Sequence, residues 1–206
     1  MSARDEILAR LRKNTREMYE KPDMKQLKGI VYADPVAEFV KKTTTTAGAR
    51  LIETKEGKRL NDVVQEIRNS LIASGKIREG VIASNLPDIE AQLNPDTVAE
   101  AQELMKVDMG VIEGRIGVAE NACIWIPQTM KEKAVCFASE QLVIVLSRSA
   151  IVNNMHEAYE RIAASDEYFR TYPFGTFISG PSKTADIESA LVYGAQAARG
   201  VTVVLV

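Results

Sequence analysis

The stretch that decides the fold is Tyr172-Pro-Phe-Gly-Thr-Phe-Ile-Ser-Gly-Pro-Ser-Lys-Thr-Ala-Asp-Ile-Glu188. It opens on an apolar, β-favouring segment at residues 176–178, turns through the Ser-Gly-Pro of residues 179–181, and enters a helical pattern at about Ser182. A strand, a glycine turn and a helix in this order point backbone N–H groups and a helix N-terminus at an anion. The stretch therefore predicts an α/β unit with an anion-binding turn.

Several side chains near this turn suit an anion. Ser179, Ser182 and Thr184 supply hydroxyl donors, and Lys183 supplies a positive charge. Two carboxylates follow in the expected first helical turns, where the helix macrodipole favours them. An ordinary tight turn that caps a helix explains the same residues equally well. The candidate binding residues are Ser179, Gly180, Pro181, Ser182, Lys183, Thr184, Asp186 and Glu188.

The same stretch is not a nucleotide P-loop. Gly175 and Gly180 have the G-x-x-x-x-G spacing, but the pattern then needs Lys followed by Ser or Thr at once. Here residues 181–182 intervene before Lys183-Thr184. The spacing therefore excludes ATP or GTP hydrolysis by this route.

Composition limits the class of protein. The chain has 206 residues, 46% of them hydrophobic, which is enough to bury one core. A formal net charge of −2 provides no field that attracts nucleic acid or an anionic membrane. No apolar run approaches the roughly 18 residues that a membrane helix needs, and residues 1–6 do not resemble a signal peptide. We therefore expect a soluble, cytoplasmic protein with no membrane span and no nucleic-acid partner.

Cysteine and histidine are too few for most metal sites. Cys123 and Cys136 lie in apolar surroundings and form no C-x-x-C, so we expect two small buried side chains. His156, the sole histidine, is expected to be exposed or to cap a helix. This set excludes a zinc site of usual make-up and an iron–sulfur cluster held by this chain alone. A metal held only by carboxylates is not excluded, but no pattern points to one, so no metal and no cofactor is expected here.

The remaining segments alternate between strand and helix patterns. Residues 1–33 predict a helical extension, with an amphipathic helix over residues 1–20, and Asp34 and Pro35 mark the next helix start. The threonines at 43–46 favour a loop. Predicted strands are 51–52, 81–83, 134–137, 142–146 and 201–206, and predicted helices are 60–71, one opened by Asn94-Pro95-Asp96, and 155–162. This order predicts one three-layer α/β/α domain over residues 34–206 with a mainly parallel sheet.

Glu120 is the best single candidate for catalysis. It interrupts an apolar stretch within residues 107–126, whose glycines predict strand, turn, strand and fit no dinucleotide fingerprint. A carboxylate there must be paired, exposed at a strand end or shifted in pKa. A structural glutamate in an ion pair with Arg115 or Lys183 explains it equally well.

Residues 178–188, followed by Leu191, Val192 and Gly194, resemble the closing motif of the LUD-domain family. The best-known members of that family are the lactate-utilisation proteins of type C. The family continues with Gly-Val-His-Gly-Pro, where this chain has Gly194-Ala-Gln-Ala-Ala198. A role that needs that histidine is therefore not carried over to Gln196.

A second motif supports the same resemblance. Ala119 and Glu120 match the start of the family's Ala-Glu-Thr-Gly-Thr run, and Asn121, Ala122 and Cys123 replace its last three residues. The glutamate carries over and the hydroxyl donors do not, although Asn121 is still able to donate a hydrogen bond. The two motifs cover about residues 107–206, and the N-terminal half is similar to the family in length and rhythm only.

The resemblance implies both a fold and a function. The fold would be that of the group containing sugar-phosphate isomerases and CoA transferases, with the ligand at the carboxyl ends of the strands, where Glu120 and residues 179–184 converge. The chain would be a subunit of a cytosolic system that oxidises lactate to pyruvate. Lys183 would hold a small anion, Glu120 would act as an acid/base or orienting group, and iron–sulfur and oxidase-like partner chains would carry electrons. Alternatives are a stand-alone enzyme or sensor for a phosphorylated or CoA-linked metabolite, and a scaffold whose site has decayed.

Overall fold

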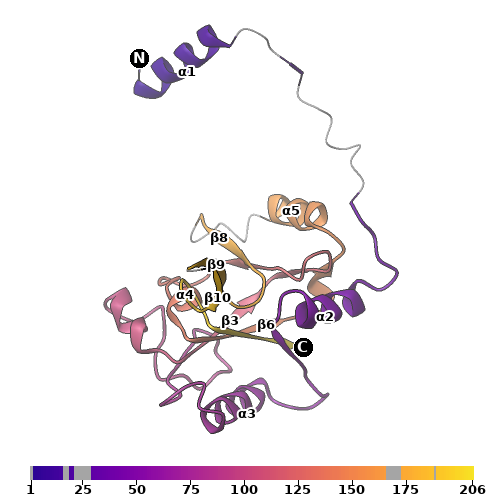
Figure 1. The fold of residues 1–206 in the computed structure, drawn as a ribbon, viewed down its shortest axis with the longest axis vertical. Helices are drawn as coiled ribbons and strands as arrows, with labels where there is room; N and C mark the ends of the chain where they lie inside the picture. The colour runs from indigo at the N-terminus through magenta and orange to yellow at the C-terminus, as the bar shows by residue number, and fades with distance from the viewer. Residues whose placement is uncertain (1, 16–18, 21–28, 166–172, 188) are drawn as a thin grey trace.

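A computed structural model describes residues 2–15, 19–20, 29–165, 173–187 and 189–206 (Figure 1). Its centre is a five-stranded sheet in the order β1-β11-β6-β3-β2, in which every neighbouring pair is parallel. The strands are β1 (Arg50–Glu53), β2 (Ile82–Ala83), β3 (Met109–Gly114), β6 (Gln141–Leu146) and β11 (Gly200–Leu205). The predicted α/β fold with a mainly parallel sheet is confirmed.

β6 and β11 occupy the middle of this sheet because their sequences are apolar almost without a break. Every residue of β6 is buried, and its register with β11 pairs Leu142 with Val201 and Leu146 with Leu205. A strand that is covered on both faces needs apolar side chains on both. The strands predicted at 142–146 and 201–206 are therefore confirmed.

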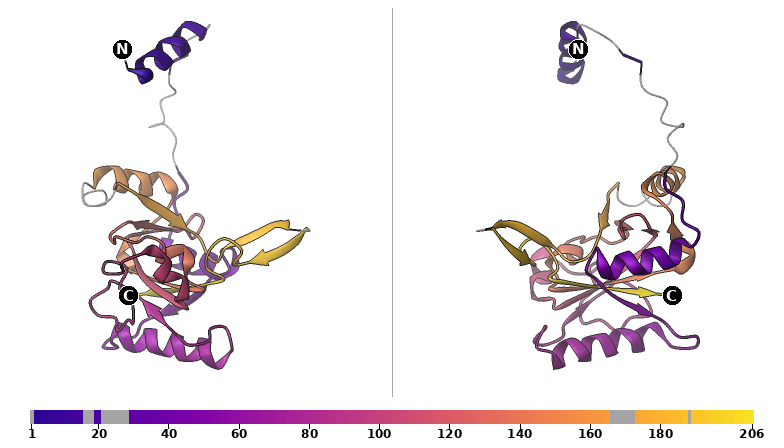
Figure 2. Two further views of the ribbon diagram at one scale, coloured as in Figure 1. Left: turned by 90° about the vertical axis from the view of Figure 1, so that its left-hand side faces the viewer. Right: turned by 45° about the vertical axis from the view of Figure 1, so that its right-hand side comes forward.

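Different elements cover the two faces of the central sheet. α3 (Leu60–Ala73) packs Val64 and Ile67 against one face. The other face is covered by α2 (Pro35–Thr45), through Phe39, and by a second sheet in the order β7-β4-β5-β8. The strands of the second sheet are β4 (Ile116–Val118), β5 (Ile124–Pro127), β7 (Ile151–Val152) and β8 (Gly175–Ile178). α5 (Met155–Ala164) packs on the outer side of that sheet, and Figure 2 shows α3 and α2 on opposite sides of β11.

The helix predicted from Ser182 onward is wrong. Residues 183–193 instead form a β-hairpin, β9 (Lys183–Ile187) and β10 (Ala190–Tyr193), which projects from the body in Figure 2. In this hairpin Thr184 pairs with Val192, eight positions later in the chain, and Lys183 pairs with Tyr193, ten positions later. Such a partner outweighs a local preference for a helix start. Asp186 therefore lies in a strand, and Glu188 lies outside the described residues.

Two other predicted elements are wrong. Asn94-Pro95-Asp96 does not open an α-helix, because Gln92 and Leu93 donate backbone hydrogen bonds to Ile82 and the Asn94 side chain accepts one from Asp96. A short 3-10 helix follows at Ala101–Lys106. Residues 134–137 are not a strand, since Ala138 N–H bonds the carbonyl of Ala134 and closes a single helical turn. That turn is α4 (Val135–Ala138), and a second 3-10 helix spans Arg148–Ala150.

The threonine run also differs from its prediction. α2 continues through Thr45, and the hydroxyls of Thr44 and Thr45 both donate to the carbonyl of Lys41. β-branched residues are tolerated in a helix when the hydroxyl bonds back to the preceding turn in this way. The start of α2 is as predicted, since Asp34 accepts a hydrogen bond from Ala37 N–H and Pro35 is the first helical residue.

The N-terminal helix α1 (Ala3–Asn14) stands apart from the body in Figure 1. It is shorter than predicted and begins with a capping box between Ser2 and Asp5. The division into an extension at 1–33 and a domain at 34–206 stays a prediction. Among the described residues, no helix has the length and apolar character to cross a membrane.

Candidate functional site

The predicted anion-binding loop spans residues 179–184, and its first part, the turn at residues 179–183, joins β8 to β9 and lies beside the start of β11. Ser182 N–H donates to the carbonyl of Ala198, 2.9 Å away, and the Ser182 carbonyl accepts from Gly194 N–H at 3.0 Å. These two bonds hold the turn against residues 194–198, the segment in which the family's Gly-Val-His-Gly-Pro motif is replaced. The two motif positions that are distant in sequence are therefore neighbours in space.

The turn is also fastened to the end of α2. Lys183 Nζ donates to the carbonyl of Ala47 at 2.6 Å. Gly180 has a left-handed backbone with φ of 68°, and a Cβ there would overlap the Ala47 carbonyl oxygen. Only glycine allows both this conformation and this close approach. The family-like Ser-Gly-Pro-Ser-Lys sequence is thus explained in part by packing on α2.

An open pocket of about 410 Å³ lies under the turn. Its rim is polar, with Ser179, Ser182, Lys183 and Gln196, and its floor is apolar. The buried floor residues are Cys136, Leu142, Ala198 and Val201, and Phe137, Phe177 and Ile178 also line the pocket. This mixture of an apolar floor and a few polar groups is typical of ligand sites.

The pocket lies at the amino-terminal ends of strands in the central sheet, whereas the predicted site lies at their carboxyl-terminal ends. Leu142 and Val201, which line it, are the second residues of β6 and β11, so the pocket is at the amino ends of these parallel strands. The prediction of a site at the carboxyl ends is wrong. The reason is that residues 179–183 leave β8, which runs antiparallel to β5 in the second sheet, and bond Ala198 just before β11 begins.

Glu120 lies at the end of β4 and is exposed. Its carboxylate accepts a hydrogen bond from Met155 N–H at 3.0 Å, at the first residue of α5, and its carbonyl accepts one from Lys42 Nζ at 2.8 Å. The ion pair considered with Arg115 or Lys183 is not formed, since Arg115 pairs with Glu113 and Lys183 donates to the carbonyl of Ala47. Glu120 therefore places a negative charge at a helix N-terminus, which the macrodipole favours.

The two predicted parts of the site meet at Asn121. Ser179 Oγ donates to the carbonyl of Asn121 at 3.0 Å, while the Asn121 side chain accepts from Cys123 N–H at 3.1 Å. Between them, Ala122 has φ of 57°, a left-handed backbone at the position of the glycine in the family motif. Ser179 and Asn121 are therefore in contact, whereas the Glu120 carboxylate is engaged by α5.

Two further candidates are not part of the pocket. Thr184 Oγ1 accepts a hydrogen bond from Asp186 N–H at 3.3 Å within the projecting hairpin. Neither residue lines the pocket under the turn. Glu120 and Asn121 do not line it either, whereas Ser179, Gly180, Pro181, Ser182 and Lys183 do.

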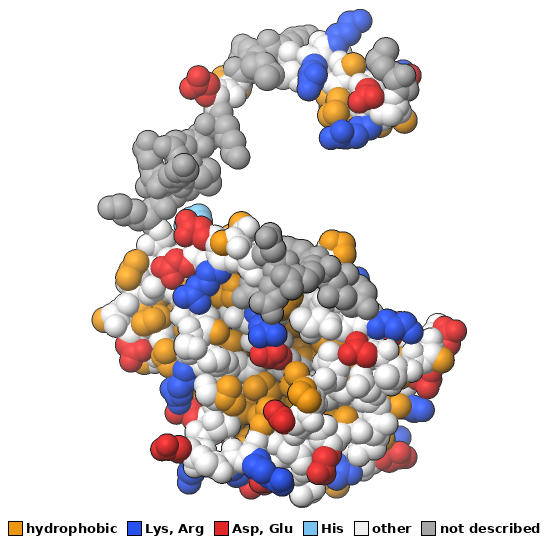
Figure 3. All heavy atoms as spheres, turned by 180° about the vertical axis from the view of Figure 1, so that it is seen from behind, with side chains coloured by type: hydrophobic (Ala, Val, Ile, Leu, Met, Phe, Trp, Pro, Cys, Tyr) orange, Lys and Arg blue, Asp and Glu red, His pale blue; other side chains and the backbone are white. Residues whose placement is uncertain are grey.

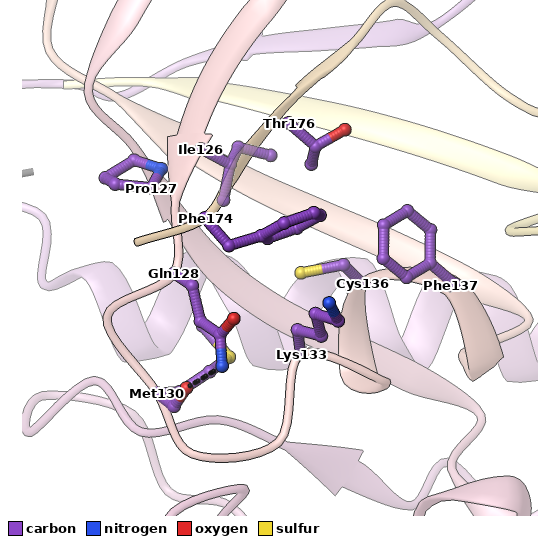
Figure 4. Close-up of a pocket in the computed structure, with 9 residues that line it drawn as sticks. All are labelled: Ile126, Pro127, Gln128, Met130, Lys133, Cys136, Phe137, Phe174 and Thr176. Atoms are coloured by element: carbon purple, nitrogen blue, oxygen red, sulfur yellow. Dashed lines mark hydrogen bonds between the residues drawn. The ribbon is translucent and has the colours of Figure 1, made fainter. Parts of the chain in front are cut away.

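Sequence patterns did not single out Phe137, whereas Gln196 stands at the position of the histidine in the family motif. Phe137 and Gln196 line both the pocket and a neighbouring hollow of about 360 Å³ next to Met105 and Glu140. Figure 4 shows a third, smaller hollow, which Phe137, Phe174 and Lys133 help to line, with the Lys133 ammonium 3.7 Å from the centroid of the Phe174 ring. Phe137 lies in the single helical turn of α4 and is exposed, and no spacing in the sequence distinguishes it from a core residue.

The ionisable groups near the pocket differ in their environment. Burial raises the pKa of the Cys136 thiol to about 12, and that of Cys123 to about 12 as well, so both are protonated near neutrality. A hydrogen bond to the Tyr32 hydroxyl raises the pKa of Lys42, with a smaller contribution from Glu38. No group of three or more His, Cys, Asp or Glu able to hold a metal ion occurs in the part of the chain that the structure describes.

Comparison with known proteins places the chain in a family. A profile of the LUD domain matches residues 36–206. An uncharacterised protein of Neisseria meningitidis serogroup B is 25% identical over 228 aligned residues, a match covering 100% of this chain and 94% of that protein. A crystal structure of a DUF162 family protein from Deinococcus radiodurans has a similar fold, with a TM-score of 0.59 and 15% identity over 86% of this chain and 99% of that one. Because the profile covers most of the sequence, the chain belongs to the LUD domain family.

Proposed function

We propose that this chain is a cytoplasmic subunit of type C in a lactate-utilisation system, and that it binds a small carboxylate in the pocket under residues 179–183. The observation that carries the proposal is the polar rim of that pocket, where Ser182 and Lys183 stand over an apolar floor. The link to lactate comes from the LUD domain family, with which lactate utilisation is associated.

The rim has the donors that a carboxylate needs. A lysine ammonium has three N–H donors, and the bond to Ala47 uses one of them. The Ser182 hydroxyl and the Gln196 amide lie on the same rim and are able to donate as well. A carboxylate bound there would receive charge-assisted hydrogen bonds, which are roughly twice as strong as neutral ones.

The proposal assigns electron transfer to iron–sulfur and oxidase-like partner chains. Cluster ligands are thiolates, and burial keeps the thiols of Cys123 and Cys136 protonated. Glu120 would orient residues around Asn121 by fixing the start of α5, since its carboxylate already bonds Met155. In this role the chain contributes binding and orientation, while the oxidation itself takes place with the partners.

Calorimetric titration of the full-length protein with L-lactate, D-lactate and pyruvate tests the binding step. We expect saturable binding of at least one acid, weakened about tenfold by Ser182→Ala, because a hydrogen bond to a charged group is lost. Thr184→Ala is the matched control, since Thr184 is outside the pocket, and should bind as the parent does. Equal losses in both variants would contradict the proposed site.

Purification of the tagged protein from its native host grown on lactate tests the assembly. Iron-containing partners and lactate-dependent reduction of a dye in the eluate support a subunit of a lactate-oxidising complex. A homogeneous protein without iron and without activity would refute that part of the proposal.

The size of the pocket favours a second candidate, a phosphorylated or CoA-linked metabolite. A volume of about 410 Å³ lies in the range of sites for drug-sized ligands, and a three-carbon acid would fill only a small part of it. A screen of thermal stability against sugar phosphates and CoA esters separates the two. Stabilisation by these compounds but not by lactate, lost in Ser182→Ala, would favour the second candidate over the first.

A further inference from the structure

The N-terminal helix α1 exposes its whole apolar face. None of its residues is buried, and Ile7, Leu8 and Leu11 are 59%, 36% and 59% exposed. In Figure 3 its hydrophobic side chains lie open at the surface between Lys and Arg side chains. Because Ile7 and Leu11 are four residues apart, they lie on the same face, with Leu8 beside them.

This helix is well specified at its ends but too short to be stable alone. Ser2 and Asp5 form a capping box at its start, and Thr15 N–H and Oγ1 both bond the Leu11 carbonyl at its end. It has only 12 residues, and isolated helices below about 12–15 residues are marginal in water. Most of the stability of such a helix must come from packing of its apolar face.

The charges beside that face are arranged for a second copy of the same helix. Asp5 is three residues before Leu8 and Arg12 is four residues after it, so both lie on the Leu8 side of the helix. One is an acid near the N-terminus and the other a base near the C-terminus. In antiparallel orientation, Arg12 of a second α1 lies beside Asp5 of the first, and Asp5 of the second lies beside Arg12 of the first.

We propose that α1 pairs in antiparallel orientation with α1 of a second copy of this chain, through Ile7, Leu8 and Leu11. The two-fold axis lies between residues 8 and 9. Ile7 of one helix then lies next to Leu11 of the other, and the Asp5–Arg12 contact is made twice, as a two-fold interface requires. The outer residues Glu6, Ala9 and Lys13 remain in water.

The dimer is expected to be weak. A pair of 12-residue helices is small beside the roughly 1,200–2,000 Å² that stable interfaces bury. Sedimentation of the full-length protein over a wide concentration range should therefore show a monomer–dimer equilibrium rather than a fixed dimer. A protein that stays monomeric throughout this range would overturn the proposal.

A pair of charge reversals tests the partner surface. Arg12→Glu should raise the dissociation constant about fivefold to tenfold, because two exposed ion pairs are lost and each is replaced by a pair of carboxylates that repel one another. Lys13→Glu changes the net charge and the last helical turn equally but lies on the outer face, so it should leave the equilibrium unchanged. Equal effects of the two variants would show that general charge, and not this contact, governs association.

Cysteine cross-linking tests the orientation. The native Cys123 and Cys136 are buried, so single Ile7→Cys and Leu11→Cys variants should report on α1 alone. Mixing the two variants under mild oxidation should give a disulfide between the different chains faster than either variant gives with itself. Preferential linking of each variant to itself would indicate parallel helices and overturn the antiparallel arrangement. Neither the dimer nor its orientation depends on what the pocket binds.

Discussion

Lys183 and Ala47 are joined by a 2.6 Å hydrogen bond that places an ammonium group at the C-terminal end of α2. At the other side of the site, the Glu120 carboxylate is 3.0 Å from Met155 N–H, at the N-terminal end of α5. Each charge thus lies at the helix end whose dipole has the opposite sign. The two residues that looked most like substrate-binding and catalytic groups therefore also support the fold.

Replacing Lys183 with Met should lower the free energy of unfolding by about 1 kcal/mol, because the bond to Ala47 and the favourable charge at the end of α2 are both lost. Lys183→Arg keeps the charge and should recover most of this loss. Urea denaturation of the two variants and the parent measures the effect. A Met variant as stable as the parent would show that Lys183 acts only on ligands.

Replacing Glu120 with Ala should also cost about 1 kcal/mol, because Met155 N–H loses its acceptor and α5 loses a charge at its start. Glu120→Gln keeps an acceptor oxygen and should lose about half as much. Hydrogen exchange at the Met155 amide should quicken most in the Ala variant. Identical exchange in both variants would contradict the bond to the carboxylate.

Gly180→Ala should destabilise the protein by more than about 2 kcal/mol, since it combines left-handed strain with overlap on the Ala47 carbonyl. Gly57→Ala is the control. Gly57 also has positive φ, 80°, but a Cβ there meets no described atom within 4 Å, so its cost should be strain alone, about 1 kcal/mol. Thermal unfolding measures the loss of stability in each variant. Equal losses would mean that the turn at Gly180 is not in close contact with the Ala47 carbonyl.

The buried thiols predict a loss of stability in alkali. Burial raises the pKa of Cys123 and Cys136 from 9.0 to about 12 in the folded protein, so the unfolded chain ionises first. Their contribution is complete below about pH 9 and is lost as the pH rises toward 12, by about 1 kcal/mol per thiol between about pH 9 and pH 10.

The control for this prediction is a variant with both cysteines changed to Ala. Lysine and tyrosine titrate similarly in the variant and the parent, so the difference in their alkaline stability isolates the thiols. Parallel stability curves for the two proteins above about pH 9 would show that the thiols are not shielded from water.

Local signals were sufficient for much of the central sheet and its helices. Asp34 and Pro35 fix the start of α2, helical spacing marks residues 60–71, and the unbroken apolar run 142–146 marks a doubly covered strand. In each case the signal is local in the sequence. It is a helix cap, the spacing of apolar residues on one helix face, or an unbroken apolar run in a strand. The family-like motif at 178–188 likewise identified the turn that lies over the pocket.

Non-local pairing decided the rest. Ser182-Lys183-Thr184 has the composition of a helix start, but its partner strand ends at Tyr193, and strand pairing depends on such neighbours more than on propensity. The turn at residues 179–183 lies at the amino-terminal ends of β6 and β11. This position follows from the antiparallel pairing of β8 with β5, where Ile178 is opposite Ile124. No pattern within residues 172–188 contains that information.

The position of β11 between β1 and β6 has a consequence for biosynthesis. Of the five strands of the central sheet it is the last that the ribosome makes, yet it is the one that joins β1, through pairs such as Arg50 with Thr202, to the rest. Until residues 200–205 emerge, β1 has no neighbouring strand in that sheet and one apolar edge of β6 is open to other nascent chains. The central sheet is therefore completed in one late step, and the growing polypeptide, rather than the finished protein, is the form in which these strand edges are open to aggregation.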